Sequence, residues 1–261
     1  MMFDALAARA LDAASSHGAS YADIRFDDGR TERAEVRNGD VVTLTDARSC
    51  GYGIRAFVDG AWGFAASARL DDAGVDDTAA LAVAIARAGA AIAKHRFAQA
   101  PTERYVDTFR TPVERDPASV PLGERVALLL DVERALHATP SVRVGRAWID
   151  LWQTEKVFYS TTGSRIEQTI VQSGSGCSAL AVGDDDAQDR SYPGDIGLYQ
   201  SGGGEIIEAA ALLENAARIG EEATQLLTAP QCPAGVRDIG QEQIFAYGMR
   251  AGLWRMLDAL D

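Results

Sequence analysis

Lysine is nearly absent from the sequence, which has only Lys94 and Lys156 among its 261 residues. Positively charged residues are outnumbered overall. The sequence has 25 Lys and Arg residues and 38 Asp and Glu residues, which gives a net charge of −13. A nucleic-acid-binding surface needs a basic stripe that neutralises phosphates. The composition therefore predicts that the chain binds no nucleic acid.

Cysteine is also scarce. Cys50, Cys177 and Cys232 are far apart and odd in number, which fits neither a disulfide framework nor the ligand spacing of a zinc site. Cys50 and Cys177 fall in predicted strands, where a thiol usually behaves as a small buried apolar group. We expect reduced thiols, and hence a cytoplasmic protein.

The three histidines, His17, His95 and His137, each lie near the end of a predicted helix. A protonated histidine there interacts favourably with the helix dipole, which explains the residues without a catalytic role. Neither H-E-x-x-H nor H-E-x-x-x-H occurs. The sequence therefore predicts no catalytic residue, no metal ligand and no cofactor in this chain.

Long apolar runs are missing as well. No uncharged apolar stretch approaches the ~20 residues that a membrane-spanning helix needs. Residues 1–20 carry Asp4, Arg9 and Asp12 within an alanine-rich pattern, unlike a signal peptide. We expect a soluble, cytoplasmic protein that makes no use of a membrane.

What the sequence does contain is two successive runs of strand-like segments, each flanked by helical ones. A helix from residue 3 to His17-Gly18 precedes strands at residues 21–26, 31–37 and 41–46 and a hairpin over residues 50–67. Residues 27–30 are predicted to form a turn, and Asn38-Gly39 a second one. A helix over residues 75–96 follows, with a predicted apolar stripe made of Leu81, Ala84, Ile85, Ala88 and Ile92.

A similar plan is repeated after a segment rich in proline at residues 97–120. A helix at residues 122–138 precedes four predicted strands, and a helix over residues 205–227 ends the run. The strands are expected at residues 142–152, 155–160, 164–173 and 177–182, with a turn at 161–163. These patterns predict an α+β fold of two helix–antiparallel sheet–helix units in tandem. We place the units at residues 1–112 and 113–228, followed by a linker and tail at 229–261.

The hairpin over residues 50–67 is the most specific local pattern. Asp59-Gly60 lies between two alternating apolar runs and is typical of a two-residue type I′ turn. The alternation puts Tyr52, Ile54, Ala56 and Val58 on one face of the first strand. We predict that this hairpin is the centre of the first sheet and that Trp62 or Phe64 is largely buried. The glycines at 51, 53 and 63 indicate bulges or a close backbone approach.

This hairpin, G-Y-G-I-R-A-F-V-D-G-A-W-G-F-A-A-S, resembles the N-terminal signature of the TldD/PmbA family, which contains zinc-dependent peptidases. Two further segments in the same order carry the resemblance: G-A-S-Y-A-D-I-R-F at residues 18–26 and L-T-A-P-Q-C-P-A-G at residues 227–235. The resemblance thus covers residues 1–239. It marks a set of family-motif positions that would lie near a bound peptide: Gly51, Gly53, Arg55, Gly60, Trp62, Gly63 and Phe64.

Members of the TldD type follow the A-P-x-C-P-x-G segment with H-E-x-x-x-H, whose histidines bind zinc and whose glutamate acts as general base. In this chain the resemblance ends after Ile239, and residues 240–261 have helical spacing unlike the family. Without zinc ligands the chain could not lower the pKa of a zinc-bound water. The resemblance therefore implies a truncated family member that is inactive alone, with residues 240–261 foreign to the family.

The resulting hypothesis is that this chain is the N-terminal, non-catalytic portion of a TldD-type zinc peptidase. The resemblance implies that it helps to shape the chamber that paired subunits enclose and supports a homo- or heterodimer with a family subunit. It would also hold peptide by strand addition. One alternative is a non-enzymatic partner subunit of the PmbA type, which lacks the zinc motif. Another is a stand-alone peptide-binding module. Folding and peptide binding by this chain without any further domain would favour the last.

Overall fold

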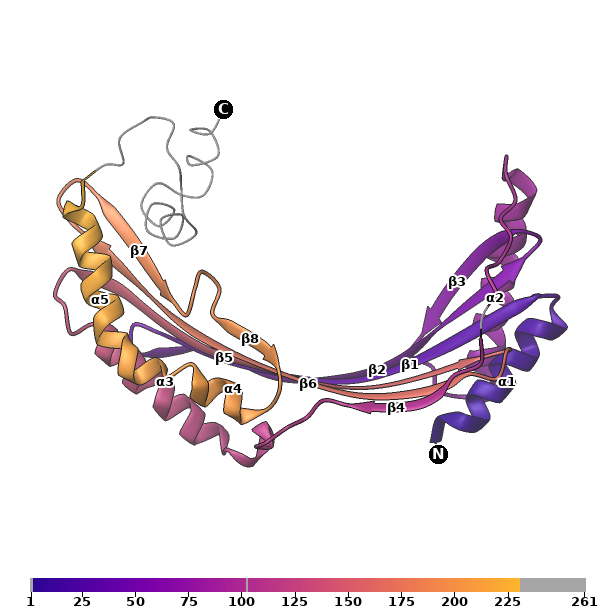
Figure 1. The fold of residues 1–261 in the computed structure, drawn as a ribbon, viewed down its shortest axis with the longest axis horizontal. Helices are drawn as coiled ribbons and strands as arrows, with labels where there is room; N and C mark the ends of the chain where they lie inside the picture. Colours follow the sequence, from indigo (N-terminus) through magenta and orange to yellow (C-terminus); the bar gives the residue numbers. More distant parts are fainter. Residues whose placement is uncertain (1, 102, 231–261) are drawn as a thin grey trace. The chain divides into compact units, whose positions relative to one another are not determined.

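The computed structural model describes residues 2–101 and 103–230 (Figure 1). The expectation for residues 240–261 therefore lies outside the described part. Five α-helices and one short 3₁₀ helix are present in it: α1 Met2–Ser16, α2 Asp72–Ile92, η1 Pro117–Ser119, α3 Leu122–Leu136, α4 Gly204–Ala209 and α5 Leu212–Thr228. None of these described helices is long and apolar enough to cross a membrane.

The same described part contains eight strands: β1 Tyr21–Arg37, β2 Asp40–Val58, β3 Ala61–Ser67, β4 Val106–Arg110, β5 Val142–Ser160, β6 Arg165–Val182, β7 Ala187–Tyr192 and β8 Leu198–Ser201. They pair in the order β3-β2-β1-β5-β6-β4, and β7 and β8 also pair with β6. The β2–β3 and β6–β7 pairs are antiparallel, while β4 and β6 are parallel. Helices and a largely antiparallel sheet confirm the α+β prediction.

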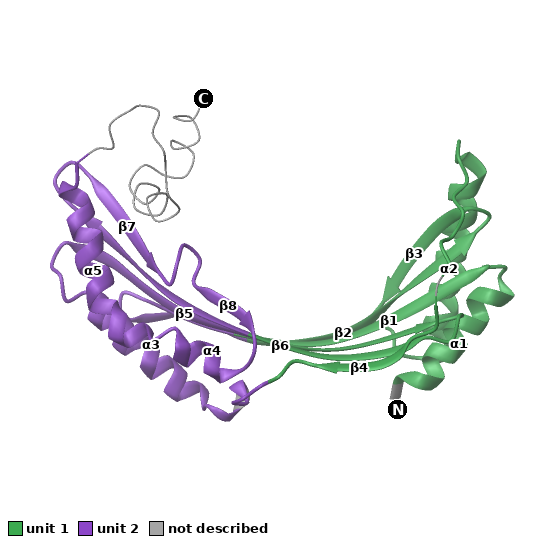
Figure 2. Cartoon of the chain, viewed as in Figure 1, with its two compact units in different colours: residues 1–32, 46–112, 152–172 green, residues 33–45, 113–151, 173–261 purple. Residues whose placement is uncertain are grey.

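The chain divides into two compact units, coloured separately in Figure 2. Unit 1 contains Met1–Glu32, Asp46–Pro112 and Trp152–Gln172, and unit 2 contains the described residues of Arg33–Thr45, Val113–Leu151 and Ser173–Asp261. Strands β1, β2, β5 and β6 are 17 to 19 residues long and contribute to both units. Each unit is therefore built from several separate segments of the chain. The contiguous domains 1–112, 113–228 and 229–261 expected from the sequence stay a prediction.

Each unit has its own hydrophobic core. In unit 1, α1 and α2 pack on β1, β2 and β3 through small and branched side chains, with Ile24, Phe26 and Ile54 fully buried. In unit 2, α3 and α5 pack on the strands through residues such as Leu129 and Ile219. Apolar burial of this kind is the main term that favours folding.

Three of the four predicted turns are confirmed. Asn38 and Gly39 have φ angles of 50° and 80°, and Asp59 and Gly60 have φ angles of 47° and 84°, the left-handed values of a type I′ turn. The register of β2 and β3 pairs Val58 with Ala61 across the second turn. Between β5 and β6 the chain turns at Gly163, which has a φ of 86°.

Several predicted breaks in the strands are wrong. The structure has no turn at residues 27–30, because β1 runs unbroken through them. In the same way β2, β5 and β6 each join two segments that the sequence separates. A polar residue or a glycine can remain in a strand when a neighbouring strand pairs with its backbone groups. The opposite error occurs at residues 205–227, where Ala211, with a φ of 46°, separates α4 from α5.

The predicted apolar stripe of α2 is also wrong. Leu81, Ile85 and Ile92 are 54%, 42% and 84% exposed, and Ala84 and Ala88 are exposed as well. The buried face of α2 is instead made of smaller residues: Gly74, Val75, Thr78, Ala79, Ala82, Val83, Ala86 and Ala90. In an alanine-rich helix apolar residues occur on every side, so their spacing alone does not identify the face that packs.

Gly63 explains why the face of α2 that carries small residues is the buried one. A Cβ atom at Gly63 would lie 2.0 Å from the carbonyl oxygen of Ala82 and 2.5 Å from the backbone nitrogen of Ala86. Strand β3 and helix α2 thus approach at backbone distance, which only small side chains permit. The predicted close approach is confirmed at this glycine.

The predicted place of the hairpin in the sheet is wrong. β3 is the first strand in the sheet order, so the hairpin lies at an edge and not at the centre. Because Gly63 and Ala65 face α2, Trp62 and Phe64 point away from it and are 44% and 57% exposed. The burial predicted for these two rings is therefore wrong as well.

Candidate functional site

The side of β1, β2 and β3 that points away from α1 and α2, here called the outer face of unit 1, carries charged and aromatic side chains. Alternation along β1 sends Ile24 and Phe26 into the core, so Asp23 and Arg25 point to the outer face. Along β2 the same alternation places Arg55 there. Three charged groups from neighbouring strands therefore meet on one surface.

Asp23 and Arg55 form the central ion pair of this face. Nη2 of Arg55 donates a hydrogen bond of 2.6 Å to Oδ2 of Asp23, and its Nε lies 3.1 Å from both carboxylate oxygens. Asp23 is fully buried, whereas the Arg55 side chain is 39% exposed. The buried carboxylate is thus neutralised by a guanidinium that still reaches solvent.

An aromatic cluster lies next to this pair. The Trp62 ring contacts Tyr21 edge-on, with ring centroids 5.7 Å apart, and Phe57 at 5.0 Å. The guanidinium of Arg55 lies over the Trp62 ring at 5.1 Å. Burial raises the pKa of the Tyr21 phenol, and the negative charge of Asp23 raises it further. Tyr21 is therefore a neutral hydrogen-bonding group at physiological pH.

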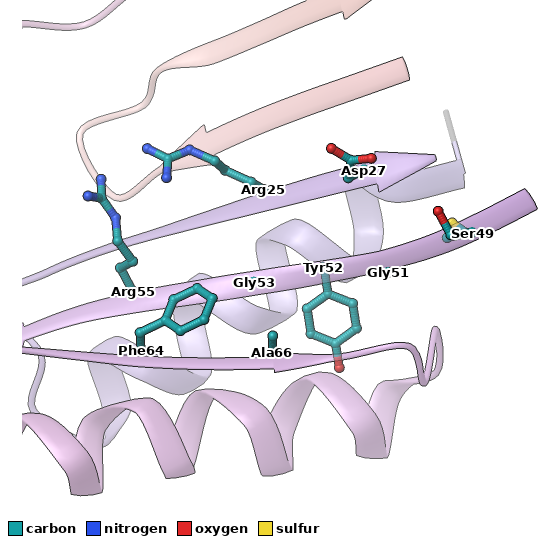
Figure 3. Close-up of a pocket in the computed structure, with 10 residues that line it drawn as sticks. Arg25, Asp27, Ser49, Gly51, Tyr52, Gly53, Arg55, Phe64 and Ala66 are labelled. Carbon is teal, nitrogen blue, oxygen red and sulfur yellow. The ribbon is translucent and has the colours of Figure 1, made fainter. Parts of the chain in front are cut away.

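A pocket of about 490 Å³ opens on the same face (Figure 3). Its lining residues come from β1, β2 and β3 and are Arg25, Asp27, Ser49, Cys50, Gly51, Tyr52, Gly53, Arg55, Phe64 and Ala66. Four of the family-motif residues predicted from the sequence are among them: Gly51, Gly53, Arg55 and Phe64. The other three, Gly60, Trp62 and Gly63, do not line it.

The remaining motif residues have structural positions instead. Gly60 forms the β2–β3 turn, Gly63 lies against α2, and Trp62 belongs to the aromatic cluster. Within the pocket, Gly53 leaves room for an aromatic ring, because a Cβ atom there would be 2.7 Å from Cε2 of Phe64. The Phe64 ring thus lies across β2 and forms a wall of the pocket (Figure 3).

Arg25 is a cationic pocket residue that the set of family-motif positions does not include. Its Nη2 lies 4.0 Å from Oδ1 of Asp23, its side chain is 55% exposed, and its guanidinium lies 5.2 Å from the centre of the Phe158 ring. The alternation in Y-A-D-I-R-F-D contains the signal, since it places Asp23, Arg25 and Asp27 on the face opposite Ile24.

A second polar cluster lies in unit 2. Asp150 is 2% exposed and accepts a 2.8 Å hydrogen bond from the Tyr199 hydroxyl and two longer ones from Arg33. Nε1 of Trp148 donates to the Tyr199 oxygen at 2.8 Å. Burial raises the pKa of Asp150, and burial followed by the Asp150 hydrogen bond raises the pKa of Tyr199 to about 12. These groups satisfy one another, so the cluster is structural.

The described residues do not fit a zinc ion. In residues 2–101 and 103–230 no three His, Cys, Asp or Glu side chains lie close enough to hold a metal. His137 instead pairs with Glu133, at 2.8 Å, and with the carbonyl oxygen of Val142. Burial raises the pKa of the Cys177 thiol to about 12, so this residue is a core side chain and not a nucleophile.

Two protein-family models match the chain. The model for PmbA/TldA metallopeptidase domain 1 matches residues 22–86, which include the outer face of unit 1. The model for the PmbA/TldA metallopeptidase central domain matches residues 115–229. Among curated proteins, a "Metalloprotease" of Methanothermobacter thermautotrophicus is 28% identical over 223 residues, which are 84% of this chain and 46% of that protein.

Three solved structures have a similar fold. A candidate modulator of DNA gyrase from Thermotoga maritima has a TM-score of 0.67 at 19% identity, over 89% of this chain and 50% of its own. A second such protein, from Bacteroides thetaiotaomicron, has a TM-score of 0.68 at 15% identity, over 94% and 56%. TldE from Thermococcus kodakarensis has a TM-score of 0.51 at 14% identity, over 85% and 47%. The chain spans about half the length of these relatives.

Proposed function

Since the chain belongs to the PmbA/TldD metallopeptidase family, we propose that it is the N-terminal, non-catalytic portion of a TldD-type zinc-dependent peptidase and binds peptide on the outer face of unit 1. The observation that carries this proposal is the pocket, because four family-motif residues line it. Zinc and the groups that activate water belong, on this proposal, to a part of the protein that these residues do not supply. The setting is the cytoplasm.

The chemistry of the pocket suits a peptide. The Phe64 ring, which lies over Gly53, is 57% exposed, and Gly51 on the same strand has no side chain. A wall that is part aromatic and part backbone can contact both the side chains and the amides of a peptide. Strand β3 also pairs with β2 alone among the described strands, so its other edge is available for strand addition.

A labelled peptide tests the proposal. The probe is the peptide Ala-Val-Phe-Thr-Val-Ala with a free C-terminus and an uncharged BODIPY fluorophore on its N-terminus, and its affinity is measured by fluorescence anisotropy. Phe64→Ala should weaken binding about tenfold or more, because a buried aromatic contact is removed. Phe109→Ala is the matched control, since Phe109 is also an exposed strand residue of unit 1, at 51%, but lies outside the pocket. Equal loss in both variants, or no binding by the wild type, would contradict the proposal.

We also propose that α2 contributes to contact with a second TldD/PmbA-family subunit. Leu81, Ile85 and Ile92 expose an apolar surface on one helix, and large apolar side chains grouped in this way commonly mark a protein interface. The occupant proposed is a second copy of this chain or a related family subunit. A PmbA-type partner role and a stand-alone peptide-binding module are the alternatives.

Sedimentation equilibrium tests the subunit contact in its homodimeric form. Ile85→Glu should shift the chain from dimer to monomer, because it places a charge in the apolar surface of α2. The control is Leu213→Glu in α5, which makes the same charge change at a position with the same 42% exposure. A wild type that stays monomeric, or equal dissociation of both variants, would contradict homodimerisation through α2.

A further inference from the structure

We propose that Arg25 and Arg55 form a carboxylate-binding subsite that fixes one negatively charged group of the bound peptide. This inference rests on the peptide-binding role proposed above and adds the class of peptide. The ligand chemistry is a carboxylate, which comes either from the C-terminus of the peptide or from an Asp or Glu side chain within it.

The first argument is the charge of the site. Arg25 and Arg55 bring two positive charges to one end of the pocket, and Asp23 cancels only one of them. Asp27 lies at the other end of the pocket (Figure 3). Its carboxylate has a partner of its own in the Lys156 ammonium group, 3.5 Å away. At the arginine end one positive charge is therefore left over, in a chain whose net charge is −13, while Asp28 adds its negative charge next to Asp27, near Cys50. Such a local excess attracts an anion.

The second argument is the supply of hydrogen-bond donors. Asp23 engages Nε and Nη2 of Arg55, which leaves Nη1 without a hydrogen-bond partner among the described residues. The Arg25 guanidinium donates no hydrogen bond within that same part of the chain, because its contact with Asp23 is 4.0 Å long. Guanidinium groups present forked donors that match the two oxygens of a carboxylate.

The third argument is that the two guanidinium groups are held in place. Both reach toward the same Asp23 carboxylate, although they come from the neighbouring strands β1 and β2. Arg25 also lies over the Phe158 ring, at 5.2 Å, and Arg55 over the Trp62 ring, at 5.1 Å. Figure 3 shows both groups at the same end of the pocket. Donors that are already ordered lose less conformational entropy on binding.

The size of the excess charge favours a carboxylate over a phosphate. A single positive charge matches a monoanion, whereas a phosphate group carries close to two negative charges. The pocket wall next to the arginines is formed by Phe64, Ala66 and Gly53, which suits the apolar part of a peptide. A nucleic acid would require a row of such positive sites.

Three labelled peptides distinguish the sources of the carboxylate. They are Ala-Val-Phe-Thr-Val-Ala with a free C-terminus, the same peptide with a C-terminal amide, and the amide with its Thr replaced by Glu. If the C-terminus is the ligand, amidation should weaken binding about tenfold and the Glu peptide should stay weak. If a side chain is the ligand, the Glu peptide should bind about tenfold more tightly than the amide.

Arg25→Gln is the variant that tests the site itself, because Asp23 keeps its hydrogen bonds to Arg55 and the fold is retained. It should abolish the difference between the charged and uncharged peptides. Arg69→Gln is the matched control, since Arg69 is an exposed arginine of unit 1 with 56% exposure against 55% for Arg25 and does not line the pocket. The control should leave the difference intact.

The outcomes separate the two proposals. Equal binding of all three peptides to the wild type would overturn the carboxylate subsite and leave peptide binding in place. A preference for charged peptides that survives in Arg25→Gln would also overturn it. Absence of binding by every peptide would instead refute the proposed peptide-binding role.

Discussion

Replacing Phe26 by alanine should lower the free energy of unfolding by about 3–5 kcal/mol. Phe26 is fully buried in the core of unit 1. Its ring is stacked on Phe3, with centroids 4.4 Å apart, and contacts the rings of Tyr52 at 5.6 Å and Tyr159 at 6.5 Å. Truncation removes these contacts with α1, β2 and β5 and leaves a cavity among them.

Phe64→Ala is the matched comparison, because it makes the same substitution in the same unit. The Phe64 ring is 57% exposed, so its removal should lower the free energy of unfolding by less than about 1 kcal/mol. Urea unfolding followed by circular dichroism measures both values. Similar losses for the two variants would show that Phe64 packs as a core residue and that the pocket wall is not open.

The two turns with an Asn-Gly or Asp-Gly pair and the covered face of β2 could be predicted from the sequence because their signals are local. Asn38-Gly39 and Asp59-Gly60 specify left-handed backbone that few other pairs adopt readily. The alternation of Tyr52, Ile54 and Ala56 against Gly53 and Arg55 has one clearly apolar side, and that side is buried. In each case neighbouring residues are sufficient to decide the structure.

The buried face of β3 could not be predicted in this way. Its two alternating sets are Trp62 with Phe64, and Gly63 with Ala65, and hydrophobicity alone selects the aromatic pair. The structure buries the smaller pair because α2 approaches β3 at the distance between Gly63 and the backbone of Ala82. That distance depends on a helix packed from elsewhere in the chain, which the local pattern does not contain.

The candidate site could also be predicted only in part from local sequence. The hairpin motif points to Gly53, Arg55 and Phe64, which line the pocket. Arg25 lies thirty residues earlier on another strand and enters the pocket through the pairing of β1 with β2. A local motif therefore identifies site residues on its own strands only. The second cation, Arg25, can be identified only when the pairing of β1 with β2 is known.

The ion pair on this face should have a large effect on stability. Arg55→Met keeps most of the aliphatic stem but leaves the Asp23 carboxylate fully buried without its main partner. Removing one partner of a buried pair typically costs about 3–5 kcal/mol, and we expect a loss of this size in the free energy of unfolding. The remaining cation, Nη2 of Arg25, is 4.0 Å away and offsets only a small part.

A second substitution separates charge from packing. Adding Asp23→Asn to Arg55→Met removes the buried charge while keeping the shape of the side chain, so the double variant should recover more than half of the lost stability. Asp76→Ala, which breaks the exposed Arg9–Asp76 pair of unit 1, is the control and should change the unfolding midpoint little, because exposed pairs are weak. If the double variant is no more stable than Arg55→Met alone, the loss comes from packing against Trp62. The buried carboxylate would then not be the reason that Arg55 is required.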